Sequence, residues 1–359
     1  MKNTKHKYPY KWTLKDANFT KDKGTVFSCF ACGGGSTMGY KLAGFDVLGC
    51  NEIDPKMMEA YKTNHNPKYS YLEPIQTFKN RKDLPKELYN LDILDGSPPC
   101  SSFSMAGNRD KDWGKEKKFR EGQAEQVLDT LFFDFIDLAK ELQPKIVVAE
   151  NVAGMLMGSA KEYVKKVYTE FQKAGYQLRI EPYLLDASTM GVPQKRKRVF
   201  FIALRNDLAL KFLEQVDMFQ TAPKLDLTFN EEPILFEQIK EINSNERQLT
   251  GNAMRLWKDR KLGDLDLDTI STRQGRPNYM FNYKFIYNKK VSNTVTGSDN
   301  CILFDEPRYR SNRELALCGS YPLDYDFLKL KNEYLIGMSV PPVMVAQIAS
   351  RIYEQWLSN

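Results

Sequence analysis

The stretch TVFSCFACGGGSTMGYKL, residues 25–42, decides the fold. Its first six residues are mostly apolar, β-branched or aromatic, which predicts a buried strand over residues 25–30. Three consecutive glycines follow, and Gly39 lies at the start of a helical pattern. A strand, a glycine-rich turn and a helix together let the backbone approach a ligand at a helix N-terminus. The same turn also occurs without a ligand, so this stretch alone leaves both interpretations open.

Apolar runs and helical patterns continue to alternate up to about residue 205, which is typical of an α/β fold with a parallel sheet. After residue 205 the pattern degrades into charged stretches and glycines, which predicts a second, smaller domain. Further strands are predicted over residues 45–53, 91–94, 146–149, 178–185 and 199–204, and helices over 54–62, 125–141, 160–174 and 334–356.

Composition bounds the class of protein without naming a function. The chain has 359 residues, 42% of them hydrophobic and 12% aromatic, which indicates a globular protein of about two domains. Its net charge of +6 is compatible with a phosphate-binding face but does not require one. No apolar run reaches about 18 residues, so we expect no membrane span. Residues 1–23 are rich in lysine and have no apolar stretch, so we expect no secretory signal there, and a solvated tail rather than a dedicated nucleic-acid arm.

The six cysteines do not have the density of a disulfide framework, and we expect reduced thiols in a cytoplasmic protein. Cys29 and Cys32 have the CxxC spacing of zinc or redox sites. A zinc site needs a second pair of ligands, and the chain has only two histidines and no second CxxC. We therefore expect no metal.

An acidic residue follows the glycine turn at the distance that an adenosyl ligand requires. The predicted second strand ends in Asn51-Glu52-Ile53-Asp54, about 20 residues after the turn. A carboxylate at this position is placed to accept hydrogen bonds from ribose hydroxyls. The turn and the carboxylate together favour a cofactor with an adenosyl group.

A cysteine follows two prolines in the stretch GSPPCSSFS, residues 96–104, at the end of a predicted strand. Proline fixes φ and lacks an N–H, so Cys100 is expected on a stiff turn at the sheet edge. Such a turn suits a nucleophile. A free cysteine is also often a small buried hydrophobic residue, and both interpretations stay open on this stretch alone.

Four further short motifs follow the glycine turn and the Pro-Cys turn along the chain. The first two are Glu150-Asn151-Val152, which alone would be a strand-end cap, and QKRKR at residues 194–198, which alone would be a solvated basic loop. Arg313-Glu314 and GMSVPP at residues 337–342 follow near the C-terminus. With the glycine turn and the Pro-Cys turn, these segments resemble the DNA cytosine-5 methyltransferases, whose motifs occur in this order. The resemblance covers about residues 24–204 and 291–355.

The resemblance implies a Rossmann-like methyltransferase sheet that uses S-adenosylmethionine, with a second, smaller target-recognition domain. Residues 1–204, completed by 328–359, would form the catalytic and cofactor-binding domain. Residues 205–327 would form the target-recognition domain and hinge. The implied reaction transfers a methyl group from S-adenosylmethionine to carbon 5 of a cytosine that is flipped out of double-stranded DNA.

The resemblance also implies roles for individual residues. The Cys100 thiolate would add to carbon 6 of cytosine, which makes carbon 5 electron-rich, and Glu150 would stabilise the ring during this addition. Arg196 and Arg198 would hold the ring or phosphates and lower the pKa of the cysteine. The implied cofactor-binding residues are Phe30, Gly33, Gly34, Gly35, Glu52, Ile53, Pro99 and Ser339. Cys32 and Met338 depart from the family pattern, and so does the absence of an aspartate near Pro74.

Two basic segments are candidates for DNA contacts. Residues 107–122 directly follow the nucleophile turn, and we expect them to form a closing loop with Arg109 and Lys111 at phosphates. Residues 271–278 contain Arg273 and Arg276, which could read base edges; a plain solvated turn explains this stretch equally well.

Two alternatives from the same family are a tRNA cytosine-5 methyltransferase and a DNA-binding relative without activity. The long segment after residue 205 favours DNA over tRNA, and intact Cys100, Glu150 and Arg196 argue against loss of activity. We expect a monomer in the cytoplasm of a bacterial or phage-infected cell, with a cognate restriction endonuclease as one partner that the family allows.

Overall fold

The computed structural model describes residues 5–99, 130–158, 160–215, 221–242, 244–277 and 279–358, and the backbone of the short strands β5 (Glu116–Lys117) and β6 (Gln126–Val127). These residues form two compact units. We call them the sheet unit, with Asn18–Asp186, Lys197–Thr228 and Val345–Asn359, and the second unit, with Met1–Ala17, Ala187–Arg196 and Phe229–Met344. Three segments expected in the sheet domain, namely residues 1–17, 187–196 and 328–344, group with the second unit, and residues 205–228 group with the sheet unit.

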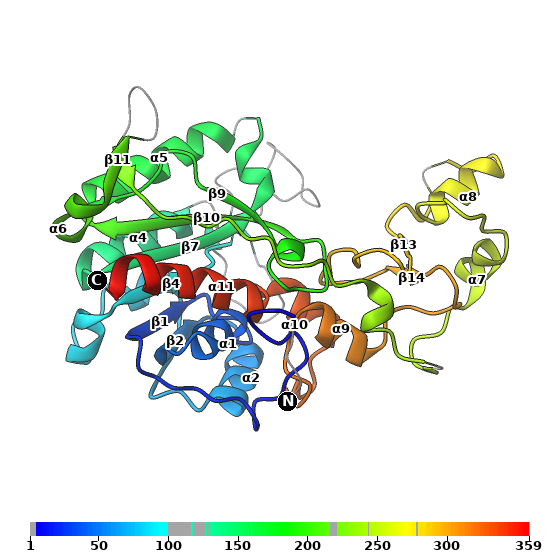
Figure 1. The fold of residues 1–359 in the computed structure, drawn as a ribbon, viewed down its shortest axis with the longest axis horizontal. Coiled ribbons are helices and arrows are strands. Elements are labelled where there is room, and N and C mark those ends of the chain that lie inside the picture. Colours follow the sequence, from blue (N-terminus) through cyan, green and yellow to red (C-terminus); the bar gives the residue numbers. More distant parts are fainter. Residues whose placement is uncertain are drawn as a thin grey trace. The chain divides into compact units, whose positions relative to one another are not determined.

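The sheet unit is built on one mixed sheet with the strand order β3-β2-β1-β4-β7-β10-β8, and β9 also pairs with β10 (Figure 1). The five strands β3, β2, β1, β4 and β7 run parallel to one another. Strand β10 is antiparallel to each of its three partners, β7, β8 and β9. The strands are β1 (Thr25–Cys29), β2 (Asp46–Glu52), β3 (Tyr69–Leu72), β4 (Ile93–Gly96), β7 (Ile146–Val152), β8 (Tyr176–Gln177), β9 (Tyr183–Asp186) and β10 (Lys197–Arg205).

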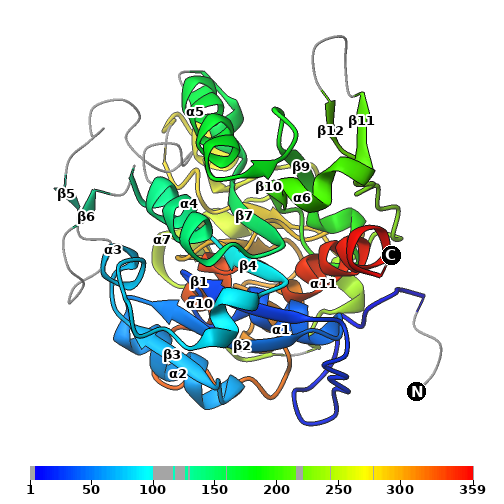
Figure 2. The same ribbon diagram turned by 90° about the vertical axis from the view of Figure 1, so that its left-hand side faces the viewer.

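Helices cover both faces of this sheet, as parallel strands require. Helices α4 (Leu131–Leu142) and α5 (Ala160–Lys173) lie side by side on one face, and α1 (Gly35–Leu42) and α11 (Pro342–Ile352) lie on the other (Figure 2). The apolar stripe of α4 is buried, and its Phe132 packs edge-on against Phe201 of β10. The alternating pattern of the sequence therefore yields the expected α/β fold.

Local signals explain where the elements begin. Helix α2 (Pro55–His65) starts after Asp54, whose carboxylate accepts from the backbone N–H groups of Lys56 and Met57. Pro55 is the first helical residue, where its missing N–H costs nothing. The same segment thus ends β2 with Glu52 and begins α2.

Three expected elements differ from the structure by more than a few residues at one end. The strand expected over residues 178–185 is β9 alone, because Pro182 cannot donate to the ladder. The helix expected over 125–141 is α4, and Gln126–Val127 belong to β6. The helix expected over 334–356 is divided into α10 (Asn332–Met338) and α11, because Pro341 disfavours helical backbone at the residue before it.

The second unit has its own apolar core under α7 (Gly251–Lys258) and α8 (Leu267–Arg273). Leu256 and Ile270 of these helices are fully buried with residues of the paired strands β13 (Phe285–Ile286) and β14 (Ile302–Leu303). A segment before α9 (Asn312–Cys318) carries two buried arginines: Arg308 forms two hydrogen bonds with Glu314, and Arg310 pairs with Asp299. These pairs stiffen the region between β14 and α9.

The remaining elements are short. They are α3 (Ile75–Phe78) and α6 (Asn206–Ala209), and the hairpin of β11 (Leu213–Gln215) and β12 (Thr221–Pro223). One segment, Asn332–Leu357, is long and apolar enough to cross a membrane, but most of it is buried inside the protein, as core helices are. Among the described residues, no group of three or more His, Cys, Asp or Glu side chains is arranged to hold a metal ion.

Candidate active site

The glycine turn after β1 has the backbone geometry of a ligand-binding turn. Phe30 and Cys32 have φ values of 53° and 51°, and Gly34, which precedes α1, has φ 85°. Non-glycine residues adopt such conformations rarely, and they persist where the surrounding structure holds them. The turn thus bends the chain sharply and presents its backbone at the carboxyl end of the sheet, where α/β proteins bind ligands.

Glu52 lies next to this turn and ties it to β2. Its carboxylate accepts hydrogen bonds from the backbone N–H groups of Cys32, Ile53 and Asp54, at 2.7–2.8 Å. Burial raises the pKa of Glu52, and these three hydrogen bonds oppose that rise. A carboxylate has about four lone-pair sites, so Glu52 can still accept from further donors.

His65, the last residue of α2, packs against the glycine turn and supports it. Its Nε2 lies 3.2 Å from the carbonyl oxygen of Gly33, which can only accept, so Nε2 carries the proton. Burial lowers the pKa of His65 to about 3, and the ring is therefore neutral at neutral pH. His65 entered the sequence-based predictions only as a possible metal ligand, and its role in supporting the turn was missed.

The nucleophile turn leaves β4 beside the end of β7. Gly96 pairs with Ala149, so the turn begins next to Glu150. The side-chain amide of Asn151 donates to the carbonyl oxygen of Pro98 at 3.0 Å and holds the turn. Pro99 is partly buried, and Cys100 lies outside the described residues. The role of Asn151 was missed, although it stands in the Glu-Asn-Val segment that drew attention to its neighbour.

Glu150 and Arg198 form an ion pair across the antiparallel strands β7 and β10. Arg198 Nε lies 2.9 Å from Glu150 Oε1, and both side chains are largely buried. Burial lowers the pKa of Arg198 and the Glu150 charge opposes this effect, so the guanidinium stays protonated. Two of the expected catalytic residues are therefore brought into direct contact at the edge where the nucleophile turn begins.

Arg196 has different surroundings, all in the second unit. Its guanidinium donates to the carbonyl oxygens of Val295, Gly337 and Ser339 at 2.8–3.1 Å. These bonds join the segment before β10 to the end of α10, where Ser339 is extended and buried. Ser339 belongs to the second unit and Gly34 to the sheet unit, and their expected proximity stays a prediction.

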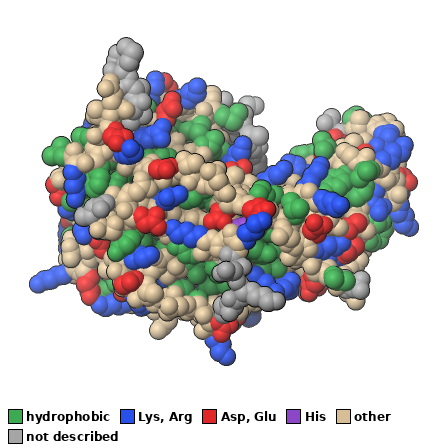
Figure 3. Space-filling view, viewed as in Figure 1, with side chains coloured by type: hydrophobic (Ala, Val, Ile, Leu, Met, Phe, Trp, Pro, Cys, Tyr) green, Lys and Arg blue, Asp and Glu red, His purple; other side chains and the backbone are tan. Residues whose placement is uncertain are grey.

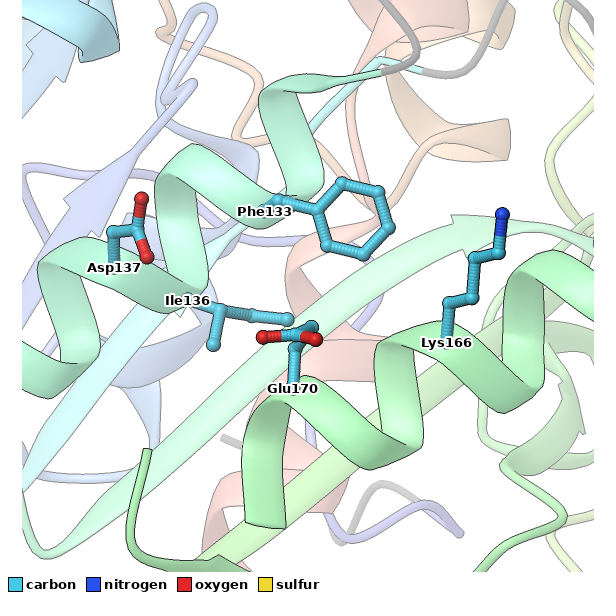
Figure 4. A pocket seen from close by; sticks show the side chains of 5 residues that line it. All are labelled: Phe133, Ile136, Asp137, Lys166 and Glu170. Atoms are coloured by element: carbon cyan, nitrogen blue, oxygen red, sulfur yellow. The ribbon is translucent and has the colours of Figure 1, made fainter. Parts of the chain in front are cut away.

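A separate hollow of about 240 Å³ lies on the outer face of α4 and α5 (Figure 4). None of the expected site residues lines this hollow. Its lining consists of Phe133, Ile136, Asp137, Lys166 and Glu170.

A family model supports the resemblance independently. The model of the C-5 cytosine-specific DNA methylases matches residues 24–354, which is nearly the whole chain. The chain belongs to this family. The matched range contains the glycine turn, Glu52, the Glu150–Arg198 pair and Ser339, so all the expected site residues of the chain fall within it.

Curated relatives of the chain are Type II methyltransferases. It is 35% identical over 189 residues to M.FnuDI of Fusobacterium nucleatum, covering 53% of this chain and 49% of that protein. It is 27% identical over 343 residues to M1.HphI of Haemophilus parahaemolyticus, covering 92% and 87% of the two chains. Its match with several relatives, M.FnuDI among them, thus spans only about half of their length.

Solved structures share the fold of the chain. A DNA modification methyltransferase encoded within an Escherichia coli prophage has a TM-score of 0.64 and 21% identity, covering 93% of this chain and 99% of that one. Spodoptera frugiperda DNMT2 has a TM-score of 0.62 and 18% identity, covering 92% and 99%. At these identities the likeness concerns the fold alone.

Replacing Gly34 by alanine tests how tightly His65 supports the turn. A Cβ at Gly34 would overlap the His65 ring, and the φ of 85° is itself unfavourable for alanine. We expect a loss of about 2–4 kcal/mol in unfolding free energy, measured by urea denaturation. Gly175→Ala is the matched control: its φ is 94° but nothing lies within 4 Å of the added Cβ. It should lose only about 1–2 kcal/mol, and equal losses in both variants would contradict the proposed support.

Proposed function

We propose that this protein is a DNA cytosine-5 methyltransferase that acts on double-stranded DNA. The observation that carries the proposal is the Glu150–Arg198 ion pair, which lies beside the turn leading to Cys100 in a chain of the cytosine methylase family. In this proposal Cys100 attacks carbon 6 of cytosine as a thiolate. Carbon 5 thereby becomes electron-rich enough to accept a methyl group, and loss of its proton then allows the cysteine to leave.

Glu150 and Arg198 serve this addition in complementary ways. Glu150 is placed to hydrogen-bond the ring N3 and the exocyclic amine as charge develops on the ring. Arg198 holds the Glu150 carboxylate in one orientation through their ion pair. We assign Arg198 to positioning Glu150, and Arg196 to anchoring the segment around Ser339 through its three carbonyl contacts.

The residues of the glycine turn fit S-adenosylmethionine, which would supply the methyl group as an electrophilic sulfonium when bound. Glu52 keeps acceptor capacity for about one ribose hydroxyl beyond the three backbone N–H groups that it already binds. The turn residues Gly33, Gly34 and Gly35 let the backbone approach the ligand, and Phe30, Ile53 and Pro99 provide surfaces for its apolar parts. Ser339 is a further candidate for the cofactor, and the family order of the motifs is what supports it.

The second unit is proposed to contain the target-recognition domain, within residues 205–327. Among the described residues between 251 and 290, exposed basic side chains outnumber exposed acidic ones. Asp259 is the exposed acidic residue of this range. Lysine and arginine side chains cover much of the surface over α7 and α8 (Figure 3). Such a surface suits the phosphate backbone of DNA. The exposed cations are Arg255, Lys258, Lys261, Arg273, Arg276, Lys284, Lys289 and Lys290.

The structure separates the two arginines that were proposed to read bases. Arg273 pairs with Asp264 at 2.8 Å and donates to the Asp259 carbonyl, so its guanidinium is already engaged within the protein. Arg276 is exposed beyond the end of α8. We therefore propose Arg276 as the base-reading candidate of this segment.

If Arg276 pairs with a guanine, Arg276→Ala should cost roughly 1–3 kcal/mol at one base position. Methylation measured across a library of flanking sequences would detect this as relaxed preference at that position. Lys258→Ala is a control for general phosphate contacts and should weaken all sequences equally. An unchanged preference in Arg276→Ala would remove this residue from the recognition surface.

Mapping methylated cytosines in DNA from cells that express the protein tests the whole proposal. We expect 5-methylcytosine at one short sequence and none in cells that carry an empty vector. Methylation found in tRNA and absent from DNA would favour the tRNA alternative. No modified cytosine in either, with DNA binding retained, would favour the inactive relative.

The biological setting is part of the proposal. The relatives that are named Type II methyltransferases support a role beside a cognate restriction endonuclease in the cytoplasm of a bacterial or phage-infected cell. We propose that the enzyme acts as a monomer, because flipping one cytosine requires one active site.

A further inference from the structure

Asp95 is a buried carboxylate at the end of β4, between the glycine turn and the nucleophile turn. Its side chain is 3% exposed. In the sheet it pairs with Ser28 of β1, whose hydroxyl donates to Asp95 Oδ2 at 2.8 Å. The hydroxyl of Tyr40 in α1 donates to Oδ1 at 3.2 Å. Asp95 thus joins the strand that leads to Cys100 with the strand and helix that flank the glycine turn.

Among the described residues, the ionisable groups that interact with Asp95 come from four elements, and none of these groups is a cation. They are Cys29 of β1, Tyr40 of α1, Tyr61 of α2 and Glu150 of β7. Burial is the main reason why the pKa of Asp95 rises to about 7, and the Glu150 charge adds to it. Hydroxyl donors lower this pKa but do not neutralise the charge.

Asp92, three residues earlier in the chain, differs from Asp95 because it is paired with a lysine. Its carboxylate lies 2.7 Å from Lys145 Nζ and accepts from the Thr25 backbone N–H at 2.7 Å. That carboxylate stands just before β4 and has its own cation. Asp95 lies at the carboxyl end, where an α/β sheet binds its ligand, and no protein cation of the described residues accompanies it there.

We propose that Asp95 distinguishes the positively charged sulfonium of S-adenosylmethionine from the neutral thioether of S-adenosylhomocysteine, and so favours substrate cofactor over product. The inference rests on the cofactor proposed above. A bound cation at this edge supplies the positive charge that the buried carboxylate lacks. After methyl transfer that charge is gone, and the product binds without this contribution.

The sign of the pH dependence follows from the charges. A bound cation favours the ionised carboxylate, so it lowers the pKa of Asp95, and a proton is released to the buffer on binding. Affinity for S-adenosylmethionine should therefore rise as the pH rises through about 7. If the pKa falls by one unit, this gain is on the order of tenfold. Affinity for S-adenosylhomocysteine should change much less.

Isothermal titration calorimetry in two buffers of different ionisation enthalpy measures the released protons directly. At pH 7 the wild-type protein should release up to about half a proton more with S-adenosylmethionine than Asp95→Asn does. The comparison between proteins removes any titration of the cofactor's own amine. Asp95→Asn should also lower the preference for S-adenosylmethionine over S-adenosylhomocysteine roughly five- to tenfold. Asp92→Asn is the control, and its proton release and preference should match the wild type.

Ser28→Ala provides a second test if Asp95→Asn does not fold. Removing one donor should raise the pKa of Asp95 and move the pH midpoint of S-adenosylmethionine binding upward. The role of Asp95 would be overturned if the wild type binds S-adenosylmethionine and Asp95→Asn shows the same proton release and the same cofactor preference. An unmoved pH midpoint of binding in Ser28→Ala would also overturn it. Either result would leave the proposed function intact. A wild-type protein that binds neither cofactor form would overturn both.

Discussion

A Cys100→Ala variant is expected to lose methyl transfer by roughly 10⁴-fold or more and to lose all covalent capture of DNA. The reason is chemical: carbon 5 of cytosine cannot attack a methyl sulfonium until a nucleophile has added at carbon 6. A duplex with 5-fluorocytosine at the target should trap the wild-type enzyme, because fluorine cannot leave carbon 5 as a proton does. The trapped complex is measured as a shifted band on a denaturing gel.

Cys301→Ala is the matched control for this experiment. Cys301 is buried in the second unit, and burial raises the pKa of its thiol to about 11, so it stays protonated and unreactive. This variant should trap DNA as the wild type does. Undiminished trapping by Cys100→Ala would end the assignment of the nucleophile.

Glu150→Gln should slow methyl transfer by about 10²–10³-fold while DNA affinity stays nearly unchanged. Glutamine keeps the size of the side chain but removes the charge that stabilises the ring and pairs with Arg198 at 2.9 Å. Single-turnover rates and DNA dissociation constants, measured on the same preparations, separate the two effects.

Glu162→Gln on α5 removes a carboxylate that is exposed and pairs with nearby Lys165, and it should leave both quantities unchanged. A Glu150→Gln variant whose DNA affinity falls as much as its rate would assign Glu150 to binding. A variant with wild-type rates would remove it from the chemistry altogether.

Local patterns made much of the sheet unit predictable. The apolar run of β1, the glycines after it and Glu52 at the end of β2 are close in sequence, and each follows from strand, turn and cap preferences. Their meeting at one edge follows from parallel pairing of β1 and β2. Glu150 and Arg198 were singled out from the family order, and their contact follows from the antiparallel pairing of β7 with β10.

Contacts between distant segments could not be predicted in this way. The hydrogen bond from Asn151 to Pro98 joins residues 53 positions apart, and no periodicity encodes it. Arg196 stands in a basic run that looked like a catalytic or solvated segment, yet its partners are carbonyls about 100–140 positions further along the chain. His65 and Asp95 act through buried neighbours, and burial depends on the packing of whole elements rather than on nearby residues.

The interleaving of the two units along the chain has a consequence for synthesis in the cell. The sheet unit contains residues from Asn18 to Asn359, and its last segment supplies most of α11, with Val345, Ile348 and Ile352 buried. The ribosome releases this segment only after all of the second unit has been made. The part of the sheet face that α11 covers beside α1 therefore stays uncovered until α11 has been made, and a nascent chain halted before Val345 presents exposed apolar surface to the chaperones of the cell.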